Sequence, residues 1–112
     1  MLVDFEFDQD VCILKMSGRF ATGRDAEYLR RRTEELKDRG CKKIVADLNG
    51  VPYIDSTGIG FLIGIYTTVR RDSGQFVLAG PNDKVREVLS LTKLMTILPT
   101  YDNLSKAIAA LK

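Results

Sequence analysis

The sequence predicts an α/β domain in which about four helices pack on a mixed sheet of four to five strands. A segment of alternating apolar and polar residues and then a mostly apolar run open the chain. Strand-like apolar runs then alternate with segments of helical periodicity, which gives the order ββαβαβαβα. The chain has 112 residues, a length that suits one compact core, so we expect a single domain over residues 1–112.

The first two strands are predicted to form a hairpin. Val3, Phe5 and Phe7 alternate with acidic residues, which is the period-two pattern of a half-buried strand. The polar segment 8–10 turns the chain, and the apolar run 11–16 indicates a second strand that pairs with the first.

A helix and a buried strand are expected next. Thr22 and Asp25 form a weak capping box for the helix, and Gly40 marks its end. The strand covers residues 42–48, where consecutive apolar residues indicate burial on both faces. Residues 49–54 are predicted to be a connecting loop.

A second helix is predicted from Ser56 to the break at residues 73–74, followed by a strand over residues 75–80. Residues 81–83 then open a further helix. The apolar stripe expected to cover the sheet from the second helix consists of Ile59, Leu62, Ile63, Tyr66 and Val69.

The last part of the chain predicts a strand and a helix. Residues 95–100 indicate a short edge strand, where Pro99 is tolerated. Asp102 or Asn103 is expected to begin the last helix.

The composition argues against several function classes. The formal net charge of +2 is too small to indicate nucleic acid or a membrane by itself. The chain contains no histidine, which removes the usual serine and cysteine nucleophile pairs and the commonest metal ligand. We therefore expect no catalytic residues, no metal and no cofactor.

The termini and cysteines predict a cytoplasmic protein without membrane insertion. The amino terminus is acidic and alternating, unlike a signal peptide. No apolar run approaches the ~20 residues that a spanning helix needs. Cys12 and Cys41 lie far apart in the sequence, so we expect two reduced cysteines rather than a disulfide framework.

The segment Asp55–Gly60, "DSTGIG", is the strongest candidate for a functional site. It lies where a buried strand and its loop lead into a helix, the position at which α/β sheets collect ligands. Ser56 falls at the start of that helix, where unpaired N–H groups and the helix dipole favour a phosphate. The residues alone leave open whether the segment only caps the helix or carries a further function.

Glycines and apolar residues make the same helix unusual. Gly58, Gly60 and Gly64 each cost ~1 kcal/mol relative to alanine in a helix interior. They indicate a need for close approach by a strand, a backbone or another protein. Phe61 and Ile65 lie away from the predicted core stripe, and they are expected either to meet a partner or to pack under a neighbouring helix.

Other chemistries fit the sequence poorly. "DSTGIG" lacks the lysine of a P-loop. A phosphorylated Asp55, as in receiver domains, would need an acidic pair such as Asp8 and Asp10 and a lysine after a late strand, which residues 95–100 do not provide. The arginines of segment 30–32 are interleaved with glutamates and indicate a solvated helix face rather than a nucleic-acid surface.

The segment 45–108, and with it essentially the whole chain, resembles the STAS domain family, and within it the bacterial anti-sigma factor antagonists. The most specific element is Asp55–Gly60, followed by the strand "GQFVLAG" and the helix "VREVL". The resemblance implies that Ser56 is phosphorylated by a partner anti-sigma factor, which is a serine kinase. It further implies that the unphosphorylated protein binds that kinase and so frees a sigma factor, and that a serine phosphatase resets the switch.

The resemblance also supplies the expected partner-binding residues and one departure. The residues expected to bind the kinase are Asp55, Ser56, Thr57, Gly58, Ile59, Gly60 and Phe61. Family members typically carry Gly-x-[Leu/Ile]-Asp after the second strand, whereas this chain has Ala21 in place of the aspartate. The identity of the partner and the strength of binding are therefore open, although the phosphoacceptor remains.

Three alternatives remain beside this hypothesis. A non-switching STAS adaptor in a transporter or signalling complex is the first. An enzyme that uses Asp55 or Ser56 as nucleophile is the second, and the missing histidine argues against it. Weak nucleotide binding, which the resemblance implies for some relatives, is the third. The sequence leaves the oligomeric state undetermined.

Overall fold

The structure is a computed structural model that describes residues 2–19 and 23–112. The predicted cap formed by Thr22 and Asp25 rests on side chains outside this description, as does Ala21. Among the described residues, no helix is long and apolar enough to cross a membrane.

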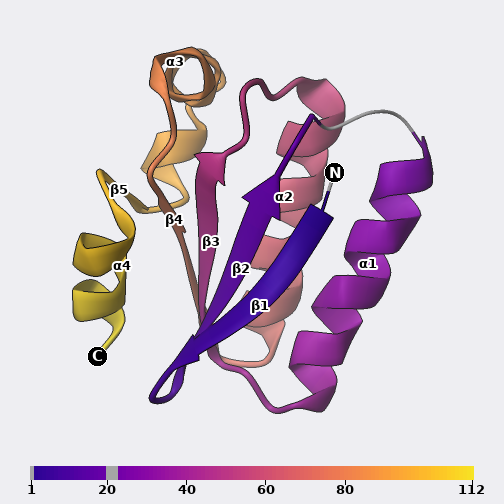
Figure 1. The fold of residues 1–112 in the computed structure, drawn as a ribbon, viewed down its shortest axis with the longest axis vertical. Coiled ribbons are helices and arrows are strands. Elements are labelled where there is room, and N and C mark those ends of the chain that lie inside the picture. Colours follow the sequence, from indigo (N-terminus) through magenta and orange to yellow (C-terminus); the bar gives the residue numbers. More distant parts are fainter. Residues whose placement is uncertain (1, 20–22) are drawn as a thin grey trace.

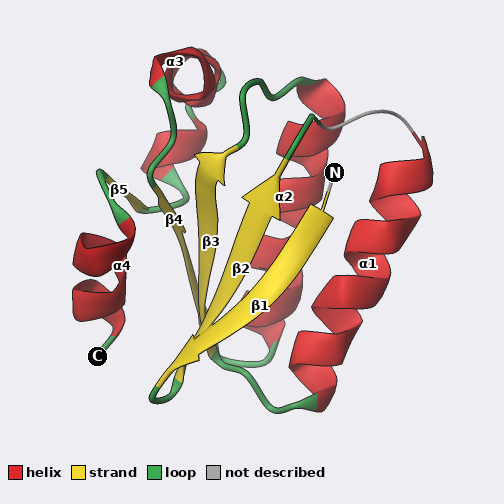
Figure 2. Ribbon diagram, in the orientation of Figure 1, coloured by secondary structure: helices red, strands yellow, loops and turns green. Residues whose placement is uncertain are grey.

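The described residues form one five-stranded sheet with helices on both faces (Figures 1 and 2). The strands are β1 Leu2–Asp8, β2 Val11–Ser17, β3 Lys43–Gly50, β4 Gln75–Ala79 and β5 Thr100–Tyr101. The helices are α1 Gly23–Asp38, α2 Ser56–Arg71, α3 Asp83–Leu91 and α4 Leu104–Leu111, with a 3₁₀ turn, η1, at Leu94–Thr96. The predicted order ββαβαβαβα is confirmed.

The strands lie in the order β1-β2-β3-β4-β5. β1 and β2 pair as the predicted antiparallel hairpin, and every later neighbour is parallel. Because successive right-handed crossovers step in one direction across the sheet, α1 and α2 lie on the same face. The carboxyl ends of β2, β3 and β4 therefore share one edge, and α2 begins at that edge.

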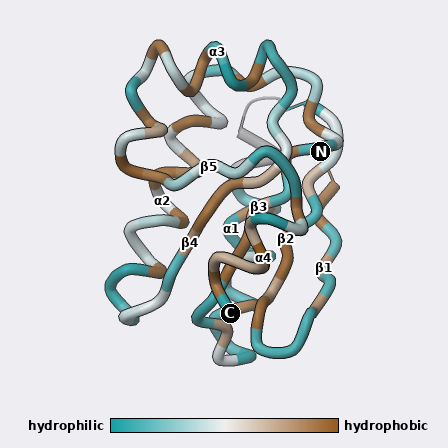
Figure 3. Tube along the Cα trace, turned by 90° about the vertical axis from the view of Figure 1, so that its left-hand side faces the viewer, coloured by the Kyte–Doolittle hydropathy of each residue, from teal (hydrophilic) through white to brown (hydrophobic). Residues whose placement is uncertain are grey.

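Each sheet face has its own core. The face under α1 and α2 buries Val3, Cys12, Leu14, Met16, Ile44, Ala46, Leu48, Phe76 and Leu78. The opposite face buries Val11, Ile13, Val45, Val77 and Ala79 against Ala107 and Leu111 of α4. Strands that are covered on both faces become apolar along their whole length, as the hydropathy of β4 shows (Figure 3).

The predicted short edge strand is present, but it lies at Thr100–Tyr101, so the prediction of a strand over residues 95–99 is wrong. Leu94 and Leu98 are both buried, and the Leu98 N–H donates to the Leu94 carbonyl at 2.9 Å, so this segment turns as a short helix. Spacing of four residues matches a helical turn and would place both leucines on one strand face as well, which made the pattern ambiguous. β5 itself is short and includes Thr100, which pairs with Leu78.

The expectation of two separate reduced cysteines is also wrong, because Cys12 and Cys41 form a disulfide with their Cα atoms 6.2 Å apart. The parallel register places Cys12 opposite Ile44 of β3. Cys41 lies just before that strand, after a turn in which Gly40 has a φ of +75°. The pairing depends on strand register, so the sequence separation of 29 residues concealed it.

The buried face of α2 differs from the predicted stripe. Ile63 is 43% exposed, whereas Ile65 is only 2% exposed and packs in the main core. The buried residues of the helix are Gly58, Ile59, Leu62, Ile65 and Val69. The arc is centred near Leu62, and Ile63, the next residue in the sequence, is turned by about 100° from it. Ile65 is therefore a core residue and does not meet a partner.

The arginines of α1 are only in part a solvated face. Arg30 is exposed and pairs with glutamates of its own helix, as predicted. Arg32 instead reaches the edge strand, where its guanidinium donates to the Val3 carbonyl at 2.8 Å and lies 4.1 Å from the centre of the Phe5 ring. The open edge of β1 is thus partly covered by α1.

Candidate functional site

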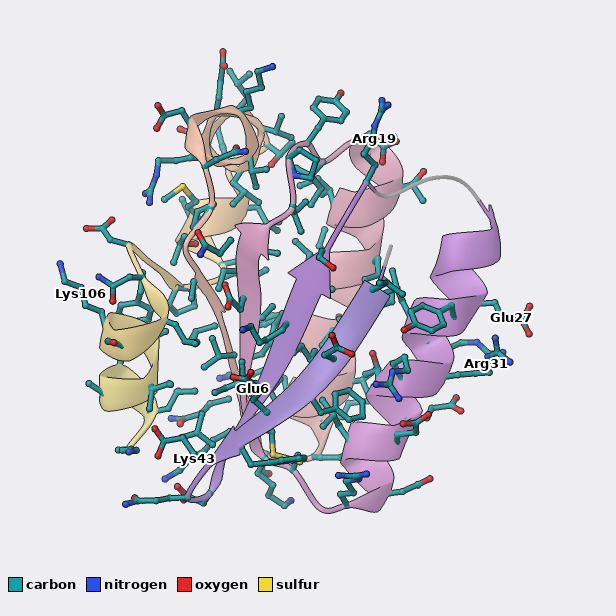
Figure 4. The ribbon with its side chains drawn as sticks, viewed as in Figure 1. Glu6, Arg19, Glu27, Arg31, Lys43 and Lys106 are labelled. Atoms are coloured by element: carbon teal, nitrogen blue, oxygen red, sulfur yellow. A yellow bond between two sulfur atoms is a disulfide. The ribbon has the colours of Figure 1, made fainter. Side chains whose placement is uncertain are left out.

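The candidate site lies at the edge formed by the carboxyl ends of the parallel strands. β3 ends at Gly50, two residues beyond the predicted boundary, and a loop over residues 51–55 leads into α2. The Gly18 N–H donates to the Gly50 carbonyl at 3.0 Å, which brings the end of β2 to the same place. Figure 4 shows Arg19 at this edge, near the first turn of α2.

Asp55 is the N-cap of α2. It has extended backbone (φ −113°, ψ −171°), and its Oδ1 accepts a hydrogen bond from the Gly58 N–H at 3.1 Å. The Ile59 N–H donates to the Asp55 carbonyl at 3.0 Å and starts the helical ladder. Because the aspartate satisfies the end of the helix, Ser56 is not needed as a cap.

Ser56 is therefore left available for chemistry. It is the first residue of α2 and is exposed. Its hydroxyl makes no hydrogen bond within the described part of the chain, whereas Thr67 and Thr68 of the same helix bond back to carbonyls one turn earlier. The cap and the candidate phosphoacceptor are thus two adjacent residues with separate roles.

The structure divides the predicted partner-binding residues between surface and interior. Ser56, Thr57 and Gly60 are exposed, and Asp55 and Phe61 are half-buried. Gly58 and Ile59 are buried and face the interior. The three exposed residues and the two half-buried ones are the part of the predicted set that a partner can reach.

Asn82 is a site residue that sequence reasoning assigned only to the start of a helix. Its Oδ1 accepts from the Val85 N–H at 2.8 Å and caps α3. Its Nδ2 donates to the Pro52 carbonyl at 3.1 Å and to the Val51 carbonyl at 3.4 Å. One side chain therefore joins α3 to the loop that precedes Ser56, a contact between segments about 30 residues apart that no local pattern reveals.

The loop itself contains an anchor and an exposed aromatic residue. Ile54 is completely buried, whereas its neighbour Tyr53 is 47% exposed. The buried Ile54 side chain holds the loop against the core, and the exposed Tyr53 side chain lies close in sequence to Asp55 and Ser56. Aromatic residues with an apolar body and a polar tip are enriched in protein interfaces.

The acidic pair considered for receiver chemistry lies at the other end of the sheet. Asp8 pairs with Lys112 at 2.8 Å, and Asp10 pairs with Lys43 at 2.8 Å. Lys43 begins β3, so both aspartates are at the amino edge of the parallel strands, away from Asp55. The hydrogen bond from Lys43 holds the pKa of Asp10 below its ordinary value.

The candidate site presents groups that are suited to recognition by a partner. Within the described residues, no group of three or more acidic or cysteine side chains could hold a metal ion. One oxygen of the Asp55 carboxylate accepts a hydrogen bond from the Gly58 N–H at the start of the helix. What the edge presents is an exposed hydroxyl, an exposed aromatic and the positive end of the 16-residue helix α2.

The chain matches known proteins over almost its full length. The STAS domain model matches residues 3–107. An anti-sigma F factor antagonist of Paenibacillus polymyxa is 26% identical over 110 residues, which cover 98% of this chain and 94% of that protein. The crystal structure of a Thermotoga maritima protein, described as a candidate anti-sigma factor antagonist, is 32% identical, with a TM-score of 0.86 and coverage of 97% and 93%.

A more distant structure shares the fold. The Bacillus cell fate determinant SpoIIAA in its phosphorylated form has a TM-score of 0.74 at 17% identity, with coverage of 99% of this chain and all of that one. The mixed sheet with helices on both faces defines an α/β domain. The chain belongs to the STAS domain family.

Proposed function

We propose that the protein is an anti-sigma factor antagonist whose binding is switched by phosphorylation of Ser56. The unphosphorylated protein binds an anti-sigma factor that is a serine kinase, and a sigma factor is released to direct transcription. The observation that carries the proposal is the exposed Ser56 hydroxyl, adjacent to an aspartate that already caps the helix. The relatives named as anti-sigma factor antagonists support it.

The local electrostatics suit such a switch. A phosphoserine carries roughly −1.5 to −2 charges at pH 7. At the first position of α2 this charge meets the positive end of the helix dipole, so the phosphorylated state is stabilised within the protein. Beside the Asp55 carboxylate it makes the surface strongly negative, so it repels an acidic partner. The switch thus needs no refolding.

In this role the protein is a substrate of the kinase and is not itself an enzyme. A serine phosphatase returns it to the binding state. Because sigma factors act on RNA polymerase, this role places the protein in the cytoplasm. Binding of nucleic acid or insertion into a membrane forms no part of the proposal.

The test uses the purified anti-sigma factor kinase of the source organism with ATP and Mg²⁺. Ser56→Ala should bind the kinase as tightly as the original protein and take up no phosphate, while Ser56→Asp should bind about tenfold more weakly or worse. Thr57→Ala is the matched control, because Thr57 is the adjacent exposed hydroxyl. Normal phosphate incorporation into Ser56→Ala would refute the assignment of the site.

The adaptor alternative has its own outcome. Affinity purification of the tagged protein from the source organism, followed by mass spectrometry, should recover the kinase. Recovery of membrane transporter subunits without any kinase would favour a non-switching STAS adaptor instead.

A further inference from the structure

A groove separates α1 and α2 on the outer side of the molecule, and it encloses about 430 Å³. One wall consists of α1 residues that include Arg30, Glu34 and Lys37, and the other of α2 residues that include Gly60 and Gly64. The two helices run side by side behind the sheet (Figure 1). We refer to this feature as the α1–α2 groove.

The two glycines keep the groove open without serving any packing need inside the protein. A Cβ atom placed on Gly60 or Gly64 would meet no heavy atom within 4 Å beyond its own helical surroundings. Both residues are exposed and lie four positions apart, one above the other on α2. Glycine weakens a helix interior, and the fold gains nothing from that loss here. The close approach predicted from these glycines is therefore not made by any described part of the chain.

The groove is continuous with the proposed kinase-binding surface. Gly60 and Phe61 are among the residues predicted to bind the partner, and both line the groove. From Ser56, the exposed face of α2 runs past Gly60 and Gly64 toward Arg71, which lies about three helical turns beyond Gly60. A partner that contacts Ser56 needs only to extend along the same helix to reach it.

The charged residues that line the groove are the two cations Arg30 and Lys37 and the single anion Glu34, so the lining has a small positive excess. Arg30 and Lys37 are 65% and 57% exposed, and they pair with carboxylates at 3.5–3.9 Å, namely with Glu34 and Glu27 and with Asp72. Exposed pairs of this kind are weak and are readily exchanged for carboxylates of a partner.

Arg71, the last residue of α2, adds a cation beyond the residues that line the groove. It is exposed and forms no ion pair within the described residues. An acidic partner is also the kind that a phosphate on Ser56 would repel, so the groove and the switch favour the same chemistry.

We propose that the α1–α2 groove receives an acidic amphipathic helix of the anti-sigma factor, packed against Gly60 and Gly64. A helix in a groove is a recurrent recognition mode, and glycines let two helix axes approach closely. Carboxylates along the partner's helix meet Lys37 and Arg71. This inference rests on the proposed function and extends its binding surface beyond the phosphorylation site.

The test fills the groove without disturbing the fold. Gly64→Leu adds a side chain where the protein offers space, two helical turns away from Ser56. We expect it to lower the affinity for the purified anti-sigma factor kinase by about tenfold or more, measured by titration calorimetry. Ser90→Leu is the matched control, since Ser90 is a small exposed residue on α3, outside the groove, and its replacement should leave the affinity unchanged.

A second pair of variants tests the charge of the occupant. Lys37→Glu reverses a cation that lines the groove, whereas Arg31→Glu makes the same change on α1 at a residue that points away from the sheet (Figure 4). We expect Lys37→Glu to lose more affinity for the kinase than Arg31→Glu does. The binding constant of Lys37→Glu should also depend less steeply on salt than that of the original protein.

The remaining outcomes distinguish a failure of the groove inference from a failure of the proposed function. If Gly64→Leu is folded by circular dichroism and binds normally while Ser56→Asp binds weakly, the groove is not used and the proposed function stands. If the unphosphorylated original protein binds no kinase, the proposed function and the groove inference fail together. If sedimentation shows a dimer that Gly64→Leu dissociates, the occupant is a second copy of this chain and not a partner's helix.

Discussion

The side-chain amide of Asn82 donates to the main-chain carbonyl of Pro52 across 3.1 Å, while its own oxygen caps α3. This bond links the segment that follows β4 to the loop that contains Asp55 and precedes Ser56. The orientation of the amide group is decided by its two roles, since only the oxygen can accept from the Val85 N–H and only the nitrogen can donate to a carbonyl.

Asn82→Asp separates the two roles of this residue. The aspartate keeps an oxygen to cap α3 but loses the donor to Pro52. We expect amide hydrogen exchange in residues 52–58 to become about three- to tenfold faster, while exchange in α3 stays the same. Asn82→Ala should accelerate both and cost about 1–2 kcal/mol in the free energy of unfolding. Unchanged exchange in Asn82→Asp would show that the loop is held by Ile54 alone.

Alanine substitution should lower the stability of the protein at Asp55 but leave it nearly unchanged at Ser56. Asp55→Ala removes the N-cap of α2 and should lower the free energy of unfolding by about 1 kcal/mol, whereas Asp55→Ser should recover most of it. Ser56→Ala removes a hydroxyl with no intramolecular bond and should stay within about 0.5 kcal/mol of the original protein. Urea denaturation measures all three variants, and a larger effect at Ser56 than at Asp55 would reverse the assignment of the cap.

Substitution by alanine should stabilise the protein at the exposed glycines of α2 and destabilise it at the glycine that follows the helix. Gly60→Ala and Gly64→Ala meet open space and should each stabilise the protein by about 1 kcal/mol. Gly74→Ala should destabilise it, because its Cβ would lie 2.7 Å from both the Lys42 carbonyl oxygen and Val69 Cγ1. Thermal unfolding provides the comparison. A destabilised Gly64→Ala would mean that the groove is closed in solution.

The disulfide should contribute measurably to stability. It closes a loop between residues 29 positions apart, so the chain-entropy model predicts a loss of about 2–4 kcal/mol on reduction. Urea denaturation with and without dithiothreitol measures this loss. The variant with both Cys12→Ser and Cys41→Ser should match the reduced protein and show no response to the reductant. Alkylation of both thiols in protein purified without reductant would contradict the bond.

The ionisation of Asp10 should make the stability of the folded protein depend on pH, independently of the candidate site at Asp55 and Ser56. The hydrogen bond from Lys43 lowers the pKa of Asp10 from its ordinary value of 3.8. A lowered carboxyl pKa stabilises the folded state above the unfolded pKa, and this contribution is lost as the pH falls through the folded value. Lys43→Met should raise the pKa of Asp10, as measured by NMR titration of the carboxyl carbon. An unmoved pKa would assign the shift to other groups.

Local patterns were reliable where one segment decides its own conformation. The alternation of Val3, Phe5 and Phe7 predicted β1, and the polar start followed by helical spacing predicted α2 from Ser56. The prediction for segment 95–100 failed because the spacing of Leu94 and Leu98 fits a helical turn as well as a strand. The packing of this segment against the core decides between the two conformations. The exposed Ile63 and buried Ile65 likewise show that the angle of α2 on the sheet is a tertiary property.

The sequence by itself determined the element order, the family and the position of the proposed phosphoacceptor, because a capped helix start and a short motif are encoded by neighbouring residues. Only the tertiary structure decided which residues meet across the chain. The bond from Asn82 to Pro52, the pairing of Cys12 with Cys41 and the α1–α2 groove all depend on strand register and helix packing. Such contacts join segments about 30 residues apart, and no local periodicity records them.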